Sequence, residues 1–368
     1  MSRDGGWAGR VRREALRAAA SAHDVEGFFD DVAKVVFQAV PCDVWAGVTV
    51  DPTTLMNTGG NYRNGVPGAL MPRMLDIEYR EGDVNLLPDL VRRRTPVGLL
   101  SQEVGGELDA SPRYRDIVKP LGCRDELRIV LRDRYGTWGA LVLGRGVDAP
   151  PFEAADIAAA GALAEPLGEA LRRLQLAERA RVAESPTAPG LILLDPDYEL
   201  VSASSTVRWW FEELESGSPG SRGLPPAVYA VAARVRAAQG PSSMGSWART
   251  RSGGCVRLHA WLLQDGPRDD PMVAVSVEPA DDGERAGFLI AAYGLTARER
   301  SVTELVLHGY STAEISRRAH LSPHTVQDHL KAVFDKVGVR SRRDLVATIF
   351  SRHYRPGLLP SRVPPSSS

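Results

Sequence analysis

The sequence predicts a multidomain protein in which two α+β units precede an all-α module of four short helices. A chain of 368 residues is too long for one ordinary core, and its 43% hydrophobic and 25% charged residues are typical of a folded globular protein. Stretches rich in Pro, Gly and Ser divide the chain at residues 184–189 and 279–283. Before the second break strand and helix patterns are mixed, and after it the apolar residues repeat only at helical spacing.

The first unit, at residues 21–182, combines helices with a meander of strands. The segment "DVWAGVTV" indicates a buried strand, and "DELRIVLRDRYGTWGALVLGRG" indicates two strands joined by a turn that contains Gly. The segment "EGFFDDVAKVVFQAV" has helical periodicity, so we expect its Asp30-Asp31 pair at a solvated helix edge and not in a phosphoacceptor site.

A long Ala/Leu-rich helix is expected to close this unit, after Pro150-Pro151 and up to about residue 184, and Pro166 should kink or split it. Its apolar spacing fits either a short parallel dimer seam or a face that covers a sheet. Because the pattern spans few heptads and contains the proline, packing on a sheet is the preferred interpretation.

The second unit, at residues 188–280, is a smaller α+β domain. It opens with "GLILLDPDYELVSAS", which gives two strands around a Pro-Asp turn, and continues with helical stretches around "VRWWFEEL" and "AVYAVAARVRAA". Three strand-like segments follow, "SWARTR", "CVRLHAWLL" and "MVAVSVEP".

The helical module lies at residues 290–355, and residues 356–368 form a tail that we expect to be disordered. Each of the four helices in this module begins with a Ser or Thr whose side chain can accept hydrogen bonds from backbone N–H groups of the first turn. These starts are Thr296 with Glu299, Ser311 with Glu314, Ser322 before Pro323, and Ser341 with Asp344. Gly309 and Gly338 fit the ends of the first and third helices.

The second and third helices are separated only by "HLS", a link that allows a tight turn between steeply crossing helices and predicts a helix-turn-helix. On the third helix one narrow apolar stripe contains Val326, Leu330, Val333 and Val337. The opposite face carries His324, Gln327, Asp328, Lys331 and Asp335.

Charge is distributed unevenly. Residues 290–355 contain eleven Lys and Arg against six Asp and Glu, a net charge of +5, whereas the chain as a whole has −1. A basic module with a polar outward helix face predicts insertion into the major groove of double-stranded DNA. Gln327 and Lys331 are the best candidates for base edges, with His324 and Asp328 weaker ones. Phosphate contacts are expected from Ser322, Thr325, Arg317, Arg318, Lys336, Arg340, Arg342 and Arg343, although any one arginine could equally be a solvated charge.

The segment "LTARERSVTELVLHGYSTAEISRRAHLSPHTVQDHLKAVFDKVGVRSRRDLV" resembles the DNA-binding domain of LuxR/NarL/GerE-type transcription regulators over nearly 60 residues. The resemblance implies that the third helix enters the major groove, that the protein acts as a homodimer, and that RNA polymerase is a further partner to consider. It also implies that the fourth helix contributes to dimerisation through Leu345, Val346, Ile349 and Phe350.

The two preceding units resemble sensor domains. The first is similar to a GAF fold, on the segments "GDVNLLPDLVRRRTPVGLLSQ" and "SPRYRDIVKPLG", and the second resembles a degenerate PAS-type unit by its order of elements. GAF domains bind small ligands or only dimerise, and no ligand-binding residue carries over, so a small-molecule ligand stays unidentified. No P-loop motif is present.

Other functional classes remain as alternatives: a GAF-domain enzyme, or a signalling adaptor with a basic targeting module. We expect neither, since no catalytic residues are indicated and a triad of Ser322, His329 and Asp335 is beyond the geometry of one short helix. His320 and His324 have the spacing of a zinc pair, but a turn and a helix start separate them.

We therefore expect no metal and no cofactor. Cys42, Cys123 and Cys255 lie far apart and indicate buried thiols. No long apolar run indicates a membrane segment, so a cytoplasmic location is expected.

Overall fold

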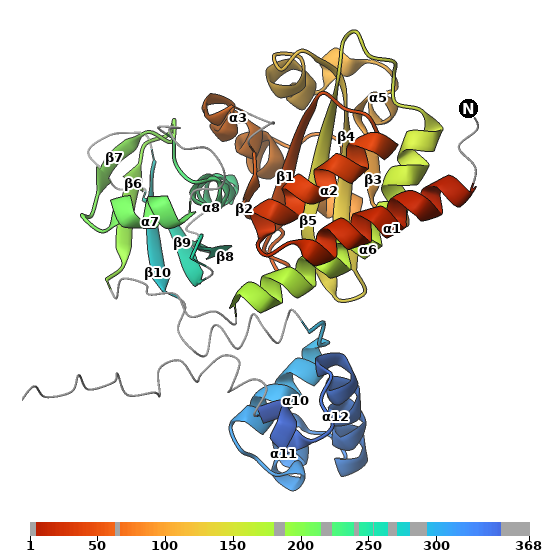
Figure 1. The fold of residues 1–368 in the computed structure, drawn as a ribbon. Coiled ribbons are helices and arrows are strands. Elements are labelled where there is room, and N and C mark those ends of the chain that lie inside the picture. The colour runs from red at the N-terminus through yellow and green to blue at the C-terminus, as the bar shows by residue number, and fades with distance from the viewer. Residues whose placement is uncertain are drawn as a thin grey trace, which may run out of the picture. The chain divides into compact units, whose positions relative to one another are not determined.

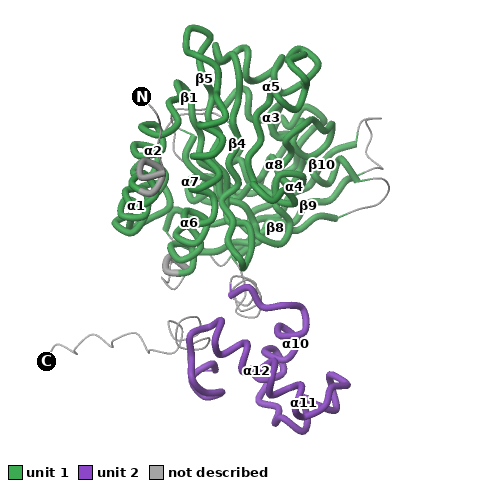
Figure 2. The backbone as a smooth tube through the Cα atoms, turned by 90° about the vertical axis from the view of Figure 1, so that its right-hand side faces the viewer, with its two compact units in different colours: residues 1–178, 183–279 green, residues 179–182, 280–368 purple. Residues whose placement is uncertain are grey.

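The computed structural model describes residues 5–62, 67–179, 188–214, 223–238, 243–252, 254–263, 271–279 and 293–346. The chain forms two units, shown in Figure 2: unit 1 comprises Met1–Glu178 and Ala183–Pro279, and unit 2 comprises Arg179–Val182 and Ala280–Ser368. Unit 1 contains two five-stranded antiparallel sheets, and unit 2 contains the helical module.

The first sheet of unit 1 has the strand order β2-β1-β5-β4-β3. Its strands are β1 (Val44–Val50), β2 (Asn57–Asn61), β3 (Val97–Leu99), β4 (Cys123–Asp133) and β5 (Gly136–Gly146). The strands predicted at 43–50 and 125–146 are therefore confirmed. The register places Gly47 of β1 opposite Leu141 of β5, at the centre of the sheet.

Helices cover one face of this sheet: α1 (Gly5–Ser21), α2 (Val25–Ala39) and α6 (Ala154–Arg179), as Figure 1 shows. The helices approach the sheet closely because glycines in the strands have no side chain: a Cβ atom on Gly47 of β1 would lie 2.2 Å from the ring of Phe29 in α2. One on Gly139 would lie 2.8 Å from Leu171 in α6. The helix α2 was predicted from sequence, and α1 was not.

The sequence predicted that Pro166 should kink or split α6, and the split is wrong, because the helix continues through this residue. A proline inside a helix costs about 3 kcal/mol. Leu163, Leu167 and Leu171 are each at most 1% exposed, and burial of a leucine side chain contributes about 1.5–3 kcal/mol. Packing on the sheet therefore outweighs the lost backbone hydrogen bond, in agreement with the packing interpretation of this helix.

Short helices cover the other face of the first sheet. They are η1 (Gly68–Leu70), α3 (Met71–Asp76), η2 (Ile77–Glu81), α4 (Leu87–Arg92), α5 (Leu100–Glu103), η3 (Leu108–Ala110) and η4 (Tyr114–Val118). The element η2 is a π-helix, and the N–H of Gly82 donates to the carbonyl oxygen of Ile77 at 3.0 Å. Because side chains alternate along a strand, β1, β4 and β5 send one set of residues to α2 and α6 and the other set to these short helices.

The second sheet has the order β7-β6-β10-β9-β8, which repeats the order of the first. Its strands are β6 (Gly190–Leu194), β7 (Leu200–Ala203), β8 (Ser243–Arg249), β9 (Cys255–Leu263) and β10 (Met272–Pro279), and its helices are α7 (Val207–Leu214) and α8 (Pro226–Ala237). Each of these elements overlaps a segment predicted from the sequence, although β8 begins three residues before the predicted "SWARTR" and α8 one residue before the predicted "AVYAVAARVRAA".

Within unit 1 the two sheets share a core. Nine residues of α8 are buried, and eight of them pack in one cluster with Met74 of α3 and Ile77 of η2. The hydroxyl of Tyr198 donates to Asp76 Oδ1 at 2.7 Å. The backbone N–H of Trp247 donates to Asp51 Oδ2 at 3.3 Å.

Unit 2 contains α10 (Ala297–Leu307), α11 (Thr312–Ala319) and α12 (Pro323–Val337), followed by helical residues 342–346. Both capping boxes are confirmed: Glu299 N donates to Thr296 Oγ1 at 3.3 Å, and Glu314 N donates to Ser311 Oγ at 3.4 Å. The fourth start is confirmed by a 3.0 Å bond from Asp344 N to Ser341 Oγ.

In the parts of the chain that the structure describes, no helix combines the length and the apolar character needed to cross a bilayer. The predicted tail at 356–368 lies outside the described residues.

Candidate nucleic-acid interface

The helix α12 has one buried and one exposed face, as its sequence predicts. Its apolar stripe is at most 8% exposed and packs against α10 and α11 in the core of unit 2; it comprises Val326, Leu330, Val333 and Val337. The opposite face is exposed and comprises His324, Gln327, Asp328, Lys331 and Asp335. The core thus fixes which side chains α12 presents outward.

The first turn of α12 is held firmly. Thr325 N donates to Ser322 Oγ at 3.0 Å, and Pro323 occupies the first helical position. The turn before it is tight because His320 adopts a left-handed conformation with φ of 54° at the end of α11. Gly338, with φ of 75°, ends α12. This is a helix-turn-helix with an exposed second helix.

The four candidates for base contacts differ in their local partners. His324 Nδ1 lies 3.0 Å from Asp328 Oδ2, and these side chains are 88% and 66% exposed, so they engage each other. Gln327 Nε2 donates to Thr312 Oγ1 of α11 at 3.4 Å, a long bond that a better acceptor could replace. Lys331 is exposed one turn further along.

The basic residues fall into two groups. Arg317, Arg318, Arg340 and Arg343 are exposed, and the Arg318 guanidinium lies 4.0 Å from the ring centroid of Tyr310. Arg342 donates to the carbonyl oxygen of Tyr310, and Lys336 is 26% exposed with bonds inside unit 2. The sequence did not predict these internal partners.

Lys336 connects the end of α12 to the start of α10. Its Nζ donates to Glu299 Oε2 at 2.6 Å and to the carbonyl oxygen of Gly294 at 3.1 Å. Burial alone would raise the pKa of Glu299, but hydrogen bonds from Lys336 and Thr296 outweigh it and hold this pKa below its ordinary value. Only one indication of this ion pair is present in the sequence: Glu299 belongs to a capping box, which fixes the position of its carboxylate.

The proposed dimerisation residues are only partly described. Leu345 is fully buried in the core of unit 2, and Val346 is half-buried against it. Ile349 and Phe350 lie outside the described residues.

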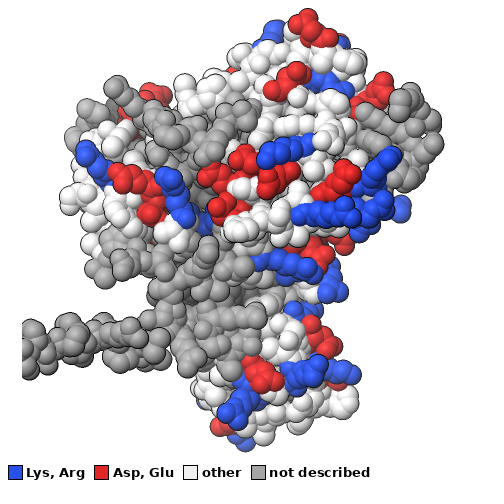
Figure 3. All heavy atoms as spheres, viewed as in Figure 1, with Lys and Arg blue, Asp and Glu red and all other residues white. Residues whose placement is uncertain are grey.

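Charge on this module is mixed. On the face that Figure 3 shows, the described part of unit 2 presents both Lys or Arg and Asp or Glu side chains. No group of three His, Cys, Asp or Glu side chains within the described ranges is arranged to hold a metal ion.

Residues 294–349 match the family described as "Bacterial regulatory proteins, luxR family". The spore germination protein GerE of Bacillus subtilis is 36% identical over 55 residues, a match that covers 15% of this chain and 74% of GerE. The chain therefore contains a luxR-type helix-turn-helix domain, and it belongs to the luxR family of bacterial regulatory proteins.

Other relatives match over similarly short lengths of this chain. The putative HTH-type transcriptional regulator Mb0914c of Mycobacterium bovis is 48% identical over 73 residues, and the probable transcriptional regulatory protein SgaR of Hyphomicrobium methylovorum is 42% identical over 53 residues. These matches cover 20% and 14% of this chain, but only 8% and 25% of those proteins.

Solved structures show looser similarity. The complex of VqmA from Vibrio cholerae with ligand and DNA is 18% identical, with a TM-score of 0.22 over 45% of this chain and 83% of that one. The DhaR(N)–DhaL complex of E. coli is 14% identical, with a TM-score of 0.22 over 76% of this chain and 91% of that one.

Proposed function

We propose that the protein is a transcription regulator that binds specific DNA sites through α12 and is controlled by unit 1. The observation that carries the proposal is the outward face of α12, where five polar side chains lie on a helix fixed by its cap and its buried stripe. A helix of this kind fits the major groove, and its first turn reaches base edges.

Within this proposal the side chains have separate roles. Gln327 and Lys331 read bases, because an amide matches adenine and an ammonium group matches guanine. His324 and Asp328 would first have to leave their mutual contact, so they contribute less. Phosphate contacts come from exposed or half-buried groups at the edges of the helix-turn-helix: Arg317, Arg318, Ser322, Thr325, Arg340 and Arg343.

Lys336 and Arg342 support this surface from within. Both side chains already bond to carbonyl or carboxylate oxygens of unit 2. A phosphate contact by either one would cost these bonds, so we assign them mainly to holding α12 and the fourth helix in place.

We further propose that the protein acts as a homodimer on two-fold related half-sites, with the fourth helix taking part. The residues given this role are Leu345, Val346, Ile349 and Phe350; because Leu345 is buried in its own core, Val346 is the described residue better placed for it.

Unit 1 supplies the sensor, divided into a GAF-like domain at 21–182 and a PAS-like domain at 188–280. The shared strand order of the two sheets supports this division into two related folds. The DNA-binding domain is placed at 290–355, and RNA polymerase is a further partner in this proposal.

The experiment is to select genomic DNA fragments with the full-length protein and to measure affinity for the selected sites at several salt concentrations. Lys331→Ala and Gln327→Ala should relax sequence preference by about 1–3 kcal/mol at the affected base pair. Arg343→Ala should weaken every site to a similar extent and reduce the salt slope by about one.

Asp31→Ala, a half-buried change in unit 1 that removes only an ion pair with Lys34, is the matched control and should alter neither property. Selection that yields no sequence enriched above non-specific binding, with protein shown to be folded, would refute the proposal.

A further inference from the structure

A cavity of about 60 Å³ lies on the face of the first sheet that is covered by short helices. Its walls are mainly apolar and include Val48, Leu90, Val130 and Ala140. A water molecule needs about 10–15 Å³ of such volume, so the space exceeds what one water fills. A second cavity of about 20 Å³ adjoins it, and Val142 of β5 lines both.

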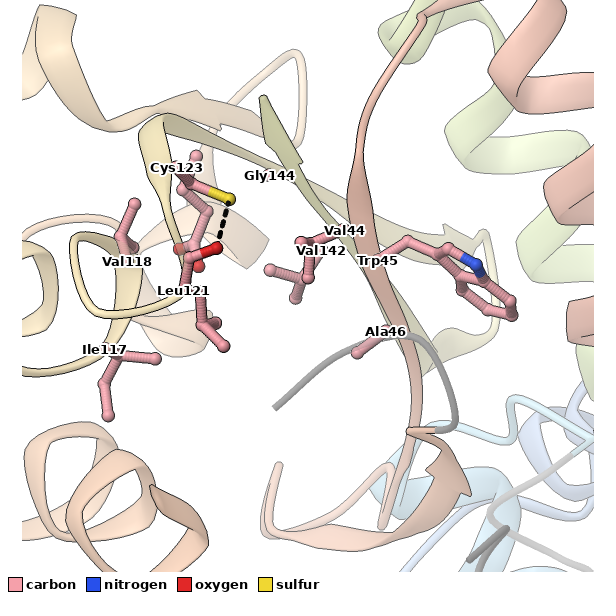
Figure 4. A pocket seen from close by; sticks show the side chains of 10 residues that line it. Val44, Trp45, Ala46, Ile117, Val118, Leu121, Cys123, Val142 and Gly144 are labelled. Carbon is pink, nitrogen blue, oxygen red and sulfur yellow. Dashed lines mark hydrogen bonds between the residues drawn. The ribbon is translucent and has the colours of Figure 1, made fainter. Parts of the chain in front are cut away.

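Figure 4 shows how strands β1 and β5 of the first sheet form one side of the smaller cavity. Val44, Ala46 and Val142 point toward Ile117 and Leu121, while the ring of Trp45 points to the opposite side of β1. The alternation of side chains along the strand thus separates the cavity layer from the layer under α2 and α6.

One wall of the larger cavity is charged. Arg113 and Arg128 line it, and the side chains of these two arginines are 3% and 8% exposed. Arg113 donates from Nε and Nη2 to both oxygens of Glu126, at 2.6 and 2.8 Å. Arg128 donates from Nε to Glu126 at 2.9 Å and from Nη1 to Glu78 at 2.8 Å.

The charged wall therefore keeps unused N–H donors on its two arginines but has little net charge. Two guanidinium groups face two carboxylates, and Asp83 also accepts from the backbone N–H of Arg113 at 2.7 Å. Nη1 of Arg113 and Nη2 of Arg128 make no hydrogen bond within the described part of the chain. Apolar residues can often replace a buried ion pair without loss of stability, so stability alone does not explain this charged cluster. Because the charges line an otherwise apolar cavity, they favour a ligand-binding role for it.

We propose that this cavity binds a small, uncharged, mostly apolar molecule that carries a carbonyl or hydroxyl oxygen, and that the spare N–H groups of Arg113 and Arg128 donate to that oxygen. An anion would be placed beside Glu126 and Glu78, which already use the positive charge, and a cation would face two guanidinium groups. The inference names the ligand class of the sensor, and so it rests on the proposed regulatory function.

The test uses three probes that have the same number of non-hydrogen atoms: butan-2-one, propanoate and 2-methylbutane. They differ in carrying an uncharged oxygen, a charged carboxylate or no polar atom. The full-length protein is labelled at its methionine methyl groups, and the signal of Met74, which lines the cavity, is assigned with Met74→Leu. Each probe is titrated while this signal is followed by NMR.

Butan-2-one should shift the Met74 signal and saturate at a concentration at least about tenfold lower than the other two, since a tenfold ratio corresponds to one modest hydrogen bond. Tighter or equal binding of propanoate would overturn the uncharged class. Equal binding of 2-methylbutane would overturn the role of the arginines. No shift with any probe would overturn the site itself.

Ala140→Leu tests the location, because it adds three carbon atoms into the cavity from β5 without touching the charged wall. It should abolish the response to butan-2-one, and Ala140→Val should weaken it. The matched control is Leu141→Met, which changes the next residue of the same strand on the opposite face and should bind as wild type.

Retained binding in a folded Ala140 variant would refute the assignment. DNA selection with the same preparation is scored separately: a protein that binds butan-2-one at this cavity but selects no DNA sequence would overturn the proposed function and leave the ligand class standing.

Discussion

Removal of the Lys336 ammonium group should lower the folding stability of unit 2. It should weaken DNA binding only through this loss of stability. In the structure Nζ bonds to Glu299 at 2.6 Å and to the carbonyl oxygen of Gly294 at 3.1 Å, and it thereby joins the last turn of α12 to the first turn of α10. Lys336→Ala leaves the Glu299 carboxylate, only 8% exposed, with its 2.7 Å bond from Thr296 N but without its cation.

The expected cost follows from these contacts. Hydrogen bonds to charged groups contribute about 1.5–3 kcal/mol each, and the 26% exposure of Lys336 reduces this, so we expect a loss of about 2 kcal/mol for the side chain as a whole. A module of this size is stabilised by about 3–8 kcal/mol in total. Since about 1 kcal/mol shifts the Tm of a small domain by about 4–8 °C, the unfolding of unit 2 should move down by roughly 10 °C.

The assay is hydrogen exchange resolved by peptide over residues 293–346, with Arg343→Ala as the matched exposed control. Glu299→Gln combined with Lys336→Met completes a double-mutant cycle, which should give a coupling of about 1–2 kcal/mol. The pKa of Glu299 is depressed in the folded protein, so this stabilisation is fully present above its ordinary pKa and is lost as pH falls through the folded value. If Lys336→Ala left protection unchanged but reduced the salt slope of DNA binding by about one, Lys336 would be a phosphate contact and the reasoning would fail.

Three further outcomes test the fold. Gly168→Ala in α6 should destabilise unit 1 by about 1–3 kcal/mol in urea unfolding despite the better helix propensity of alanine, because its Cβ would lie 2.5 Å from the backbone nitrogen of Arg132; the exposed change Glu165→Ala should not. Ser322→Ala should cost about 1 kcal/mol through loss of the α12 cap, measured by exchange of the first-turn amides. Burial alone would raise the pKa of Glu126, but the Arg113 and Arg128 guanidinium groups hold it well below its ordinary value, so stability should fall as pH drops from about 4.5 toward that lower pKa; Glu126→Gln should flatten this dependence, and an unchanged acid profile would contradict the assignment.

Local signals made the helix-turn-helix predictable from sequence. The capping residues Thr296, Ser311 and Ser322 act on amides within three positions of themselves, and the stripe from Val326 to Val337 needs only the helical period. Eight of the ten strands in the two sheets were likewise visible as apolar segments, whereas β2 (Asn57–Asn61) and β3 (Val97–Leu99) were not predicted.

Long-range pairings were not predictable in the same way. Lys336 meets Glu299, and Arg128 meets Glu78, across 37 and 50 positions of sequence, and nothing near either residue indicates its partner. The continuity of α6 through Pro166 likewise depends on the sheet beneath it, which the local rule for proline does not include. Tertiary packing decides such features, and it has no short-range signal.

The short segment formed by α3 and η2 belongs to both halves of unit 1 at once. Glu78 and Tyr79 form part of the cavity wall, while Asp76, two positions earlier, accepts the hydroxyl of Tyr198 from the second sheet. Ile77, between them, is packed in the same cluster as α8. A rotation of this segment that enlarged the cavity would therefore also move Asp76 and its hydrogen bond to Tyr198. The volume of the cavity is thus coupled to the position of the second sheet, although no described residue of that sheet lines the cavity.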